Sequence, residues 1–198
     1  PRRSPELVLT AADFPAGFEV VEIPEGQLAE MAETIVKATR EAKVDPASCV
    51  QPSLIPEAAD LSAIGLITAT KGSTINLGEA IAVVPATIED QRKMASGECE
   101  RVTMTMDIGF GPYDAIVEQK LLPAPSTKVP ADQTLVVEQQ TEAKVQSTRV
   151  VMLSRLGYAM VNGYTVTVTY TSATGTPIDD AVFDEFFTKA VNKVADET

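Results

Sequence analysis

The sequence predicts a single-domain α+β protein: a curved antiparallel sheet of about six or seven strands, three main helices packed on it, and one disulfide. Three observations predict this class. Short runs rich in β-branched residues fill the middle and end of the chain, each bounded by Gly, Pro, Asp or Ser. Three segments carry helical spacing or helix-start signals. Two cysteines far apart in the chain could form a disulfide that links distant parts of the fold.

Composition bounds the domain organisation and the class of partner. Nothing divides the 198 residues into two parts, so we expect one sensor-like domain over residues 7–198 behind an N-terminal tether of residues 1–6. The formal net charge of -12 disfavours nucleic acids and anionic membrane surfaces as partners. No apolar run is long enough for a membrane-spanning helix. Because the chain starts at Pro1 and not at methionine, we expect a processed product whose export segment lies outside it.

The first third of the chain is expected to hold one long helix. The capping-box spacing from Thr10 to Asp13 is followed by a proline and a glycine, which stop a helix within about one turn. An extended segment over 18–23 precedes an amphipathic helix over 25–42. Asp45 before Pro46 then resembles an N-cap followed by a first helical residue, so that Cys49 lies on a short helical turn.

The rest of the chain alternates strands with two capped helices. Strands are expected over 61–71, 77–84, 100–108, 115–122, 133–141, 145–155 and 164–171. Hairpin turns are expected at 71–73 and at Asn162–Gly163. In the last strand tyrosine and valine alternate with threonine, which predicts one face for the core and one for solvent.

The two capped helices begin with capping boxes. The box over 87–90 starts a helix that Gly97 ends, and this places Cys99 where the next strand begins. The box over 176–179, with Pro177 at the first helical position, starts a C-terminal helix. The apolar stripe of that helix favours packing against the sheet over binding a partner.

The cysteine pair, Cys49 and Cys99, favours a long-range disulfide over two unpaired buried thiols. The chain has no histidine and no CxxC motif, which argues against the usual zinc, haem and copper sites and against a redox pair. We therefore expect no cofactor and no metal. A disulfide would indicate an oxidising compartment, and it would tie the turn after the first long helix to the strand after the second.

The order of these parts resembles the mycobacterial exported sensor-domain proteins of unknown function, many of them lipoproteins, which are related to the extracytoplasmic sensor domain of PknH-type serine/threonine kinases. The resemblance rests on residues 7–17, Ser48–Cys49, Gly97–Cys99 and 164–194. The sensor domain of PknH carries two disulfides, whereas this chain has cysteines for one. The resemblance implies an α+β fold with a curved antiparallel sheet, export, and a lipid anchor on an N-terminal cysteine outside these residues.

Catalytic signatures are missing. Nucleophilic catalysis of the Ser-His-Asp or Cys-His type needs an imidazole, and no SxxK motif offers a serine–lysine substitute. The Gly109–Gly111 loop precedes a proline that cannot open a phosphate-binding helix, so it is read as a turn, with a ligand-contacting rim as the alternative. Acidic residues are plentiful but unspecific, and Asp179 and Asp180 are explained by helix capping. We expect a protein that is not an enzyme.

The candidate ligand site is built from methionine and tyrosine. Flexible thioethers suit a pocket for a lipid or another apolar ligand, and tyrosine adds a polar tip; ordinary core filling is the alternative. The candidate residues are Met104, Met106, Tyr113, Met152, Tyr158 and Met160.

These residues lead to a functional expectation with two alternatives. We expect an exported, lipid-anchored binding or sensor module of the cell envelope for a small amphipathic ligand or an envelope component. The membrane would be contacted only through the anchor. The alternatives are an interaction or structural envelope protein without a small-molecule site and, third, a carboxylate-based hydrolase.

Overall fold

The computed structural model describes residues 2–50, 61–107 and 111–198. Its centre is one antiparallel sheet of nine strands in the order β1-β3-β4-β9-β8-β7-β6-β5-β2. The strands are β1 (Glu19–Val20), β2 (Lys43–Asp45), β3 (Gly65–Lys71), β4 (Ile75–Ala82), β5 (Arg101–Asp107), β6 (Pro112–Leu122), β7 (Thr134–Val145), β8 (Thr148–Val161) and β9 (Tyr164–Ser172). The two shortest strands, β1 and β2, form the edges of the sheet.

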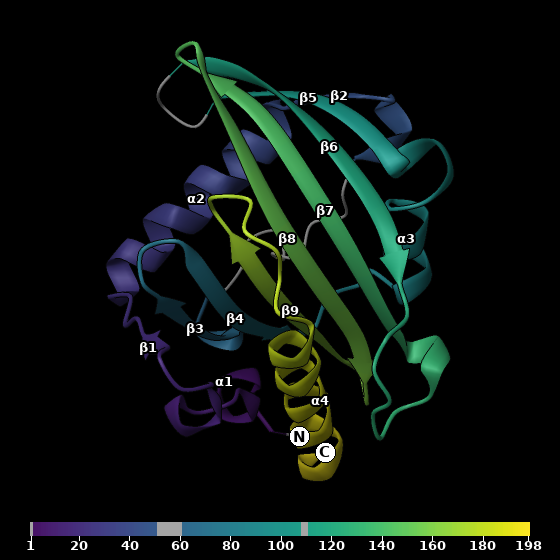
Figure 1. Cartoon of the computed structure of the whole chain (residues 1–198). Coiled ribbons are helices and arrows are strands. Elements are labelled where there is room, and N and C mark those ends of the chain that lie inside the picture. The colour runs from purple at the N-terminus through teal and green to yellow at the C-terminus, as the bar shows by residue number, and fades with distance from the viewer. Residues whose placement is uncertain (1, 51–60, 108–110) are drawn as a thin grey trace.

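Helices cover both faces of this sheet (Figure 1). The described residues include α1 (Ser4–Leu7), α2 (Glu25–Glu41), α3 (Ile88–Lys93) and α4 (Asp180–Glu197). Helix α4 packs on β8 and β9 in front of the sheet in Figure 1, whereas α2 runs behind the sheet and leads into the edge strand β2. Helix α3 packs against β7 and β8. The α+β class and the antiparallel sheet are therefore as predicted.

Both the strand count and the curvature of the sheet differ from the prediction of a curved sheet with six or seven strands. The expected strands are present as β3 to β9, and the added strands are the edge pieces β1 and β2, which are too short to leave a clear alternation in the sequence. The hairpin of β7 and β8 is also longer than expected. Its turn falls at Gln146 and Ser147, with φ of 49° and 71°, and no glycine marks this turn in the sequence. The turn at Asn162–Gly163 is confirmed, with φ of 50° and 89°.

The capping predictions were right for α3 and wrong for α4. At α3, Asp90 N–H donates to Thr87 Oγ1 at 3.1 Å and Thr87 N–H donates to Asp90 Oδ2 at 2.9 Å, which completes the expected capping box. At α4, the N-cap is Asp179, whose Oδ1 accepts from the N–H of Val182 at 3.2 Å. That helix begins at Asp180, and the Asp179 N–H, which the Thr176 box would have served, donates to the Tyr170 hydroxyl at 3.5 Å.

Three further element boundaries differ from those predicted from the sequence. Helix α3 ends at Lys93, before Gly97, and Gly97–Glu100 is a separate 3-10 turn that carries Cys99. Asp45 belongs to strand β2, and the 3-10 turn Ala47–Cys49 begins after Pro46 without a side-chain cap. The structure also places α1 within the segment expected as a tether: Ser4 is buried, and the Tyr164 hydroxyl donates to the Arg2 carbonyl at 2.5 Å.

The main apolar core lies between α4 and the sheet. Three α4 phenylalanines, Phe183, Phe186 and Phe187, are essentially inaccessible to solvent. They pack with the tyrosine–valine side of β9 and with Leu7 from α1. Burial of this stripe stabilises α4 on the sheet, as its sequence pattern predicted.

Candidate functional site

The sheet separates charged side chains from uncharged ones. Directly paired residues in an antiparallel sheet lie on the same face, and every pairing here runs without interruption. Strands β2 to β9 place all their charged residues on the face that α4 covers, which we call the charged face. These residues are Lys43, Asp45, Lys71, Glu79, Arg101, Asp107, Asp114, Glu118, Lys120, Glu138, Glu142, Lys144, Arg149 and Arg155.

The opposite face, toward α2 and α3, receives no charged side chain from strands β2 to β9, and we call it the charge-free face. Beyond them the edge strand β1 places Glu19 beside Thr70. Across strands β5 to β9 the charge-free face consists of Val102, Met104, Met106, Tyr113, Ala115, Val117, Gln119, Leu121, Leu135, Val137, Gln139, Thr141, Ala143, Val145, Thr148, Val150, Met152, Ser154, Leu156, Tyr158, Met160, Thr165, Thr167, Thr169 and Thr171.

Helix α2 covers this face only loosely. Among its described side chains, Ala38 alone is buried, whereas Met31 is 43% and Ile35 is 51% exposed. None of its side chains belongs to the apolar clusters found among the described residues. A helix with an apolar stripe normally buries that stripe, so α2 and the sheet face next to it present apolar surface that the described residues do not fully cover.

Four of the six predicted ligand residues lie on the charge-free face toward the same end of strands β5, β6 and β8, with Met152 three strands away from Met104. Met104 and Met106 on β5, Tyr113 on β6 and Met152 on β8 are all half-buried. Tyr113 pairs with Met106, and its hydroxyl donates to Met106 Sδ at 3.9 Å. Val150, 41% exposed, lies on the same face. We call these five residues the methionine region.

The other two predicted residues, Tyr158 and Met160, lie elsewhere on the same face. Tyr158 is buried in a cluster with Ile88 and Ala95 from the α3 segment, and Met160 packs against that cluster. Burial raises the pKa of Tyr158 to about 12, because a phenolate has no compensating partner there. For this pair the structure shows core filling, the alternative that the sequence left open.

A row of uncharged hydrogen-bonding side chains runs beside the methionine region. Register places six such residues side by side on six neighbouring strands. We call them the polar row: Thr70, Asn76, Thr171, Ser154, Gln139 and Gln119. Ser154 and Thr171 hydroxyls lie 3.4 Å apart, and Gln139 Nε2 donates to Gln119 Oε1 at 2.8 Å.

Sequence reasoning missed the polar row. Its members come from six strands, and only the pairing registers bring them into line. A usable signal was present in each strand separately, since charged residues occupy only one of the two alternating sets of positions. The threonines of β9, read as a solvent face, lie on this charge-free side, where Thr165 and Thr167 are buried.

The predicted disulfide is present. Cys49 and Cys99 are joined, and their Cα atoms are 5.5 Å apart. The bridge is buried beside Val44 and Val102 on the charge-free face. It links the segment that follows α2 and β2 to the 3-10 turn before β5, so it fixes one end of the α2 connection to the sheet. Such a bridge indicates an oxidising, extracytoplasmic environment.

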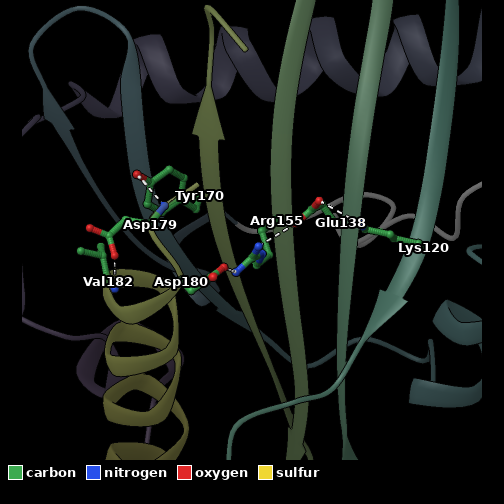
Figure 2. A network of polar contacts seen from close by, with 7 residues as sticks. All are labelled: Lys120, Glu138, Arg155, Tyr170, Asp179, Asp180 and Val182. Carbon is green, nitrogen blue, oxygen red and sulfur yellow. Dashed lines mark hydrogen bonds and ion pairs between the residues drawn. The ribbon is translucent and has the colours of Figure 1, made fainter. Parts of the chain in front are cut away.

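The charged face holds a polar network at the start of α4 (Figure 2). Arg155 on β8 is 8% exposed, and its guanidinium donates to Asp180 Oδ1 and to Glu138 Oε2, both at 2.6 Å. Lys120 Nζ lies 3.6 Å from Glu138 Oε1, and the Arg155 guanidinium lies 5.5 Å from the Phe183 ring centre. Burial opposes the charge of Arg155, but the hydrogen bonds to both carboxylates outweigh it and raise its pKa. The network fastens α4 to the sheet.

Two cavities lie apart from the methionine region. One of about 470 Å³ is lined by Arg92 and by residues between Leu121 and Leu135. One of about 680 Å³ is lined by Arg2, Val83, residues 162–164 and residues 197–198. Neither is lined by a methionine, so the methionine region is not part of either cavity. In the part of the chain that the structure describes, no group of three acidic or cysteine side chains is placed to hold a metal ion.

No helix within residues 2–50, 61–107 and 111–198 combines the length and the apolar character needed to cross a membrane. Comparisons with known proteins add the following. No protein-family model matches this chain, and no curated protein matches it. Among solved structures, an uncharacterized protein from Mycobacterium smegmatis, described as an Rv0999 ortholog, matches over 93% of this chain and 92% of its own, with a TM-score of 0.48 and 15% sequence identity.

Proposed function

We propose that this protein is an extracytoplasmic, non-enzymatic binding or sensor module that holds a small amphipathic ligand between α2 and the methionine region. The observation that carries the proposal is the loose cover of α2 over a face that receives no charged side chain from strands β2 to β9. Half-buried Met104 and Met106 lie on β5, the strand that α2 contacts, and Ile35 of α2 is 51% exposed. Flexible thioethers adapt to ligands of irregular shape.

The physical argument compares this face with the other one. Helix α4 buries six apolar residues, Phe183, Phe186, Phe187, Ala190, Val191 and Val194, against the charged face, whereas Met31 and Ile35 of α2 stay exposed. Apolar surface left open in this way favours a ligand that covers it, because each Å² removed from water contributes about 25 cal/mol. Compartment supports the proposal as well, since the Cys49–Cys99 bridge is typical of exported proteins.

The first test is native mass spectrometry of the protein purified without detergent from its own host. A bound amphiphile of defined mass is expected. The second test is saturable binding of N-phenyl-1-naphthylamine, an uncharged apolar fluorophore, by ligand-free protein.

Adjacent residues of β5 offer a matched pair of variants for this test. Met104 lies on the charge-free face and Thr103, which is exposed, lies on the charged face. Met104→Lys should weaken fluorophore binding at least about tenfold, because a charge enters an apolar site. Thr103→Lys should leave it unchanged. If no amphiphile co-purifies and the fluorophore shows no saturable binding, the proposal is wrong, and the open surface then favours the protein-binding alternative.

A further inference from the structure

We propose that the ligand's head group is uncharged and rich in hydroxyl groups, as in a glycolipid or another polyol amphiphile, and that the open end of the polar row binds it. This inference rests on the proposed function and deepens it by naming the ligand class. The open end consists of Thr70, Asn76 and Thr171, which are half-buried, exposed and half-buried, respectively.

The absence of charge from strands β2 to β9 on this face disfavours an ionic head group. A phosphate or carboxylate placed against the polar row would lose water without gaining a counter-ion from strands β2 to β9, and an unpaired ion is costly to desolvate. An ammonium would find exposed Glu19 of the edge strand β1 beside Thr70, and an exposed ion pair contributes little. The exposed charges of α2 are of both signs, for example Glu33 and Lys37, and do not select either sign. Hydroxyl and amide groups can be matched on this face by the side chains that are present.

At one end of the polar row the hydrogen-bonding groups of Gln119 are already engaged. Both donors of the Gln119 amide are used, on the carbonyls of Met94 and Cys99, and its Oε1 accepts from Gln139. Thr70 and Asn76 make no side-chain hydrogen bond to any other described residue. Three neighbouring strands at about 4.8 Å spacing give the open end a span of about 10 Å, which suits one or two sugar rings.

The open end also lies next to the apolar part of the site. Met152 lies two residues before Ser154 on the same face of β8, one side-chain row from the polar row. A ligand whose head group lies on Thr171 therefore has its chain directed along Met152 toward Met104 and Met106. Head and tail positions are thus both assigned to described side chains, with no charged side chain of β2 to β9 between them.

The test compares four amphiphiles that share a dodecyl tail: dodecyl maltoside, dodecylphosphocholine, dodecanoate and dodecyltrimethylammonium. Their dissociation constants are measured by isothermal titration below the critical micelle concentrations. Dodecyl maltoside is expected to bind at least about tenfold tighter than each charged amphiphile. The comparison with dodecyltrimethylammonium is the most stringent, because the net charge of -12 attracts cations without any specific site.

Variants then locate the head group. Thr171→Val keeps the shape of the side chain and Asn76→Leu keeps most of its volume, and each should weaken dodecyl maltoside about two- to tenfold through a lost hydrogen bond. Neither should change the affinity for N-phenyl-1-naphthylamine, which has no such head group. Gln140→Leu is the matched control, because Gln140 is an exposed amide on the charged face, and it should change neither affinity.

The outcomes separate this inference from the proposed function. If a charged amphiphile binds as tightly as dodecyl maltoside while the fluorophore still binds, the head-group assignment is overturned and the proposed function stands. If dodecyl maltoside is preferred but Thr171→Val and Asn76→Leu both leave its affinity unchanged, the polar row is not the head-group site. If neither the fluorophore nor any amphiphile binds, the proposed function itself fails.

Discussion

The Glu79 carboxylate accepts a 2.7 Å hydrogen bond on Oε1 from the backbone N–H of Leu9, a residue 70 positions earlier in the chain. Glu79 is 1% exposed on β4, and its Oε2 has no hydrogen-bond partner among the described residues. Lys193 of α4 donates to the neighbouring Val8 carbonyl at 2.6 Å. The N-terminal segment is therefore held to the sheet from one side and to α4 from the other.

Glu79 should make stability depend on pH. Burial raises its pKa from 4.5 to about 7, against the Leu9 hydrogen bond and the charge of Lys193, while Asp13 adds to the rise. Because the folded state holds this proton more tightly than the unfolded state, stability should fall as pH rises from about 4.5 to about 7, by roughly 3 kcal/mol. Glu79→Gln keeps an acceptor for Leu9 and should remove this fall.

The measurement is urea unfolding of both proteins at several pH values between about 4.5 and 8. Other groups titrate equally in both proteins, so the difference between the two curves isolates Glu79. Parallel curves would show that Glu79 titrates as an ordinary carboxyl group.

Arg155→Ala should destabilise the fold by about 2 to 4 kcal/mol, because it removes a buried guanidinium and leaves half-buried Glu138 without its main partner. Arg149→Ala is the control. Arg149 also binds a carboxylate, that of Glu142 at 2.7 Å, but its side chain is 66% exposed, so little change is expected. Chemical denaturation of both variants measures the loss in free energy of unfolding. Equal losses in the two variants would contradict a structural role for the network.

The disulfide should contribute about 2 to 5 kcal/mol, since it closes a loop between residues with a sequence separation of 50. The double variant Cys49→Ser/Cys99→Ser leaves no lone thiol and isolates this contribution in urea unfolding. Before that comparison, thiol labelling of the denatured, unreduced protein should add no mass. Two labelled thiols, or a variant as stable as the parent, would show that the bridge has no stabilising role in solution.

Gly157 should not tolerate a side chain. A Cβ at this position would come 2.5 Å from Phe187 Cδ2 and 3.1 Å from Phe183 Cζ, so Gly157→Ala should cost about 1 to 3 kcal/mol through overpacking. Gly26 of α2 offers the matched control, because its added Cβ meets nothing within 4 Å. Gly26→Ala should leave stability equal or slightly higher, given the helix propensity of alanine. The midpoint temperatures of thermal unfolding of the two variants should shift in opposite directions or differ by several degrees.

Local signals predicted the parts of this protein that local chemistry specifies. The Thr87 capping box, the Asn162–Gly163 turn and the α4 phenylalanine stripe all appear as expected, because each depends on residues within a few positions of one another. The edge strand β2 and the turn at Gln146–Ser147 were not predicted, because the first is fixed by pairing with β5 and the second has no glycine to mark it.

The candidate site also has a part that the sequence predicted and a part that only the structure shows. The methionines and tyrosines were identified by residue type, and all six lie on one face of the sheet, but the sequence could not separate Met104 and Met152, which stay half-buried, from Tyr158 and Met160, which pack with the α3 segment. That difference depends on which helix packs over each part of the sheet. Burial of a side chain is set by distant elements, which a pattern within one strand does not contain.

The sequence by itself determined that each strand would carry its charges on one side, because successive side chains point to opposite faces with a period of two. Only the tertiary structure decided that those sides coincide. A shift of one residue in any register would turn a whole strand over, and it is the unbroken pairing from β2 through β9 that assembles the charge-free face, the methionine region and the polar row.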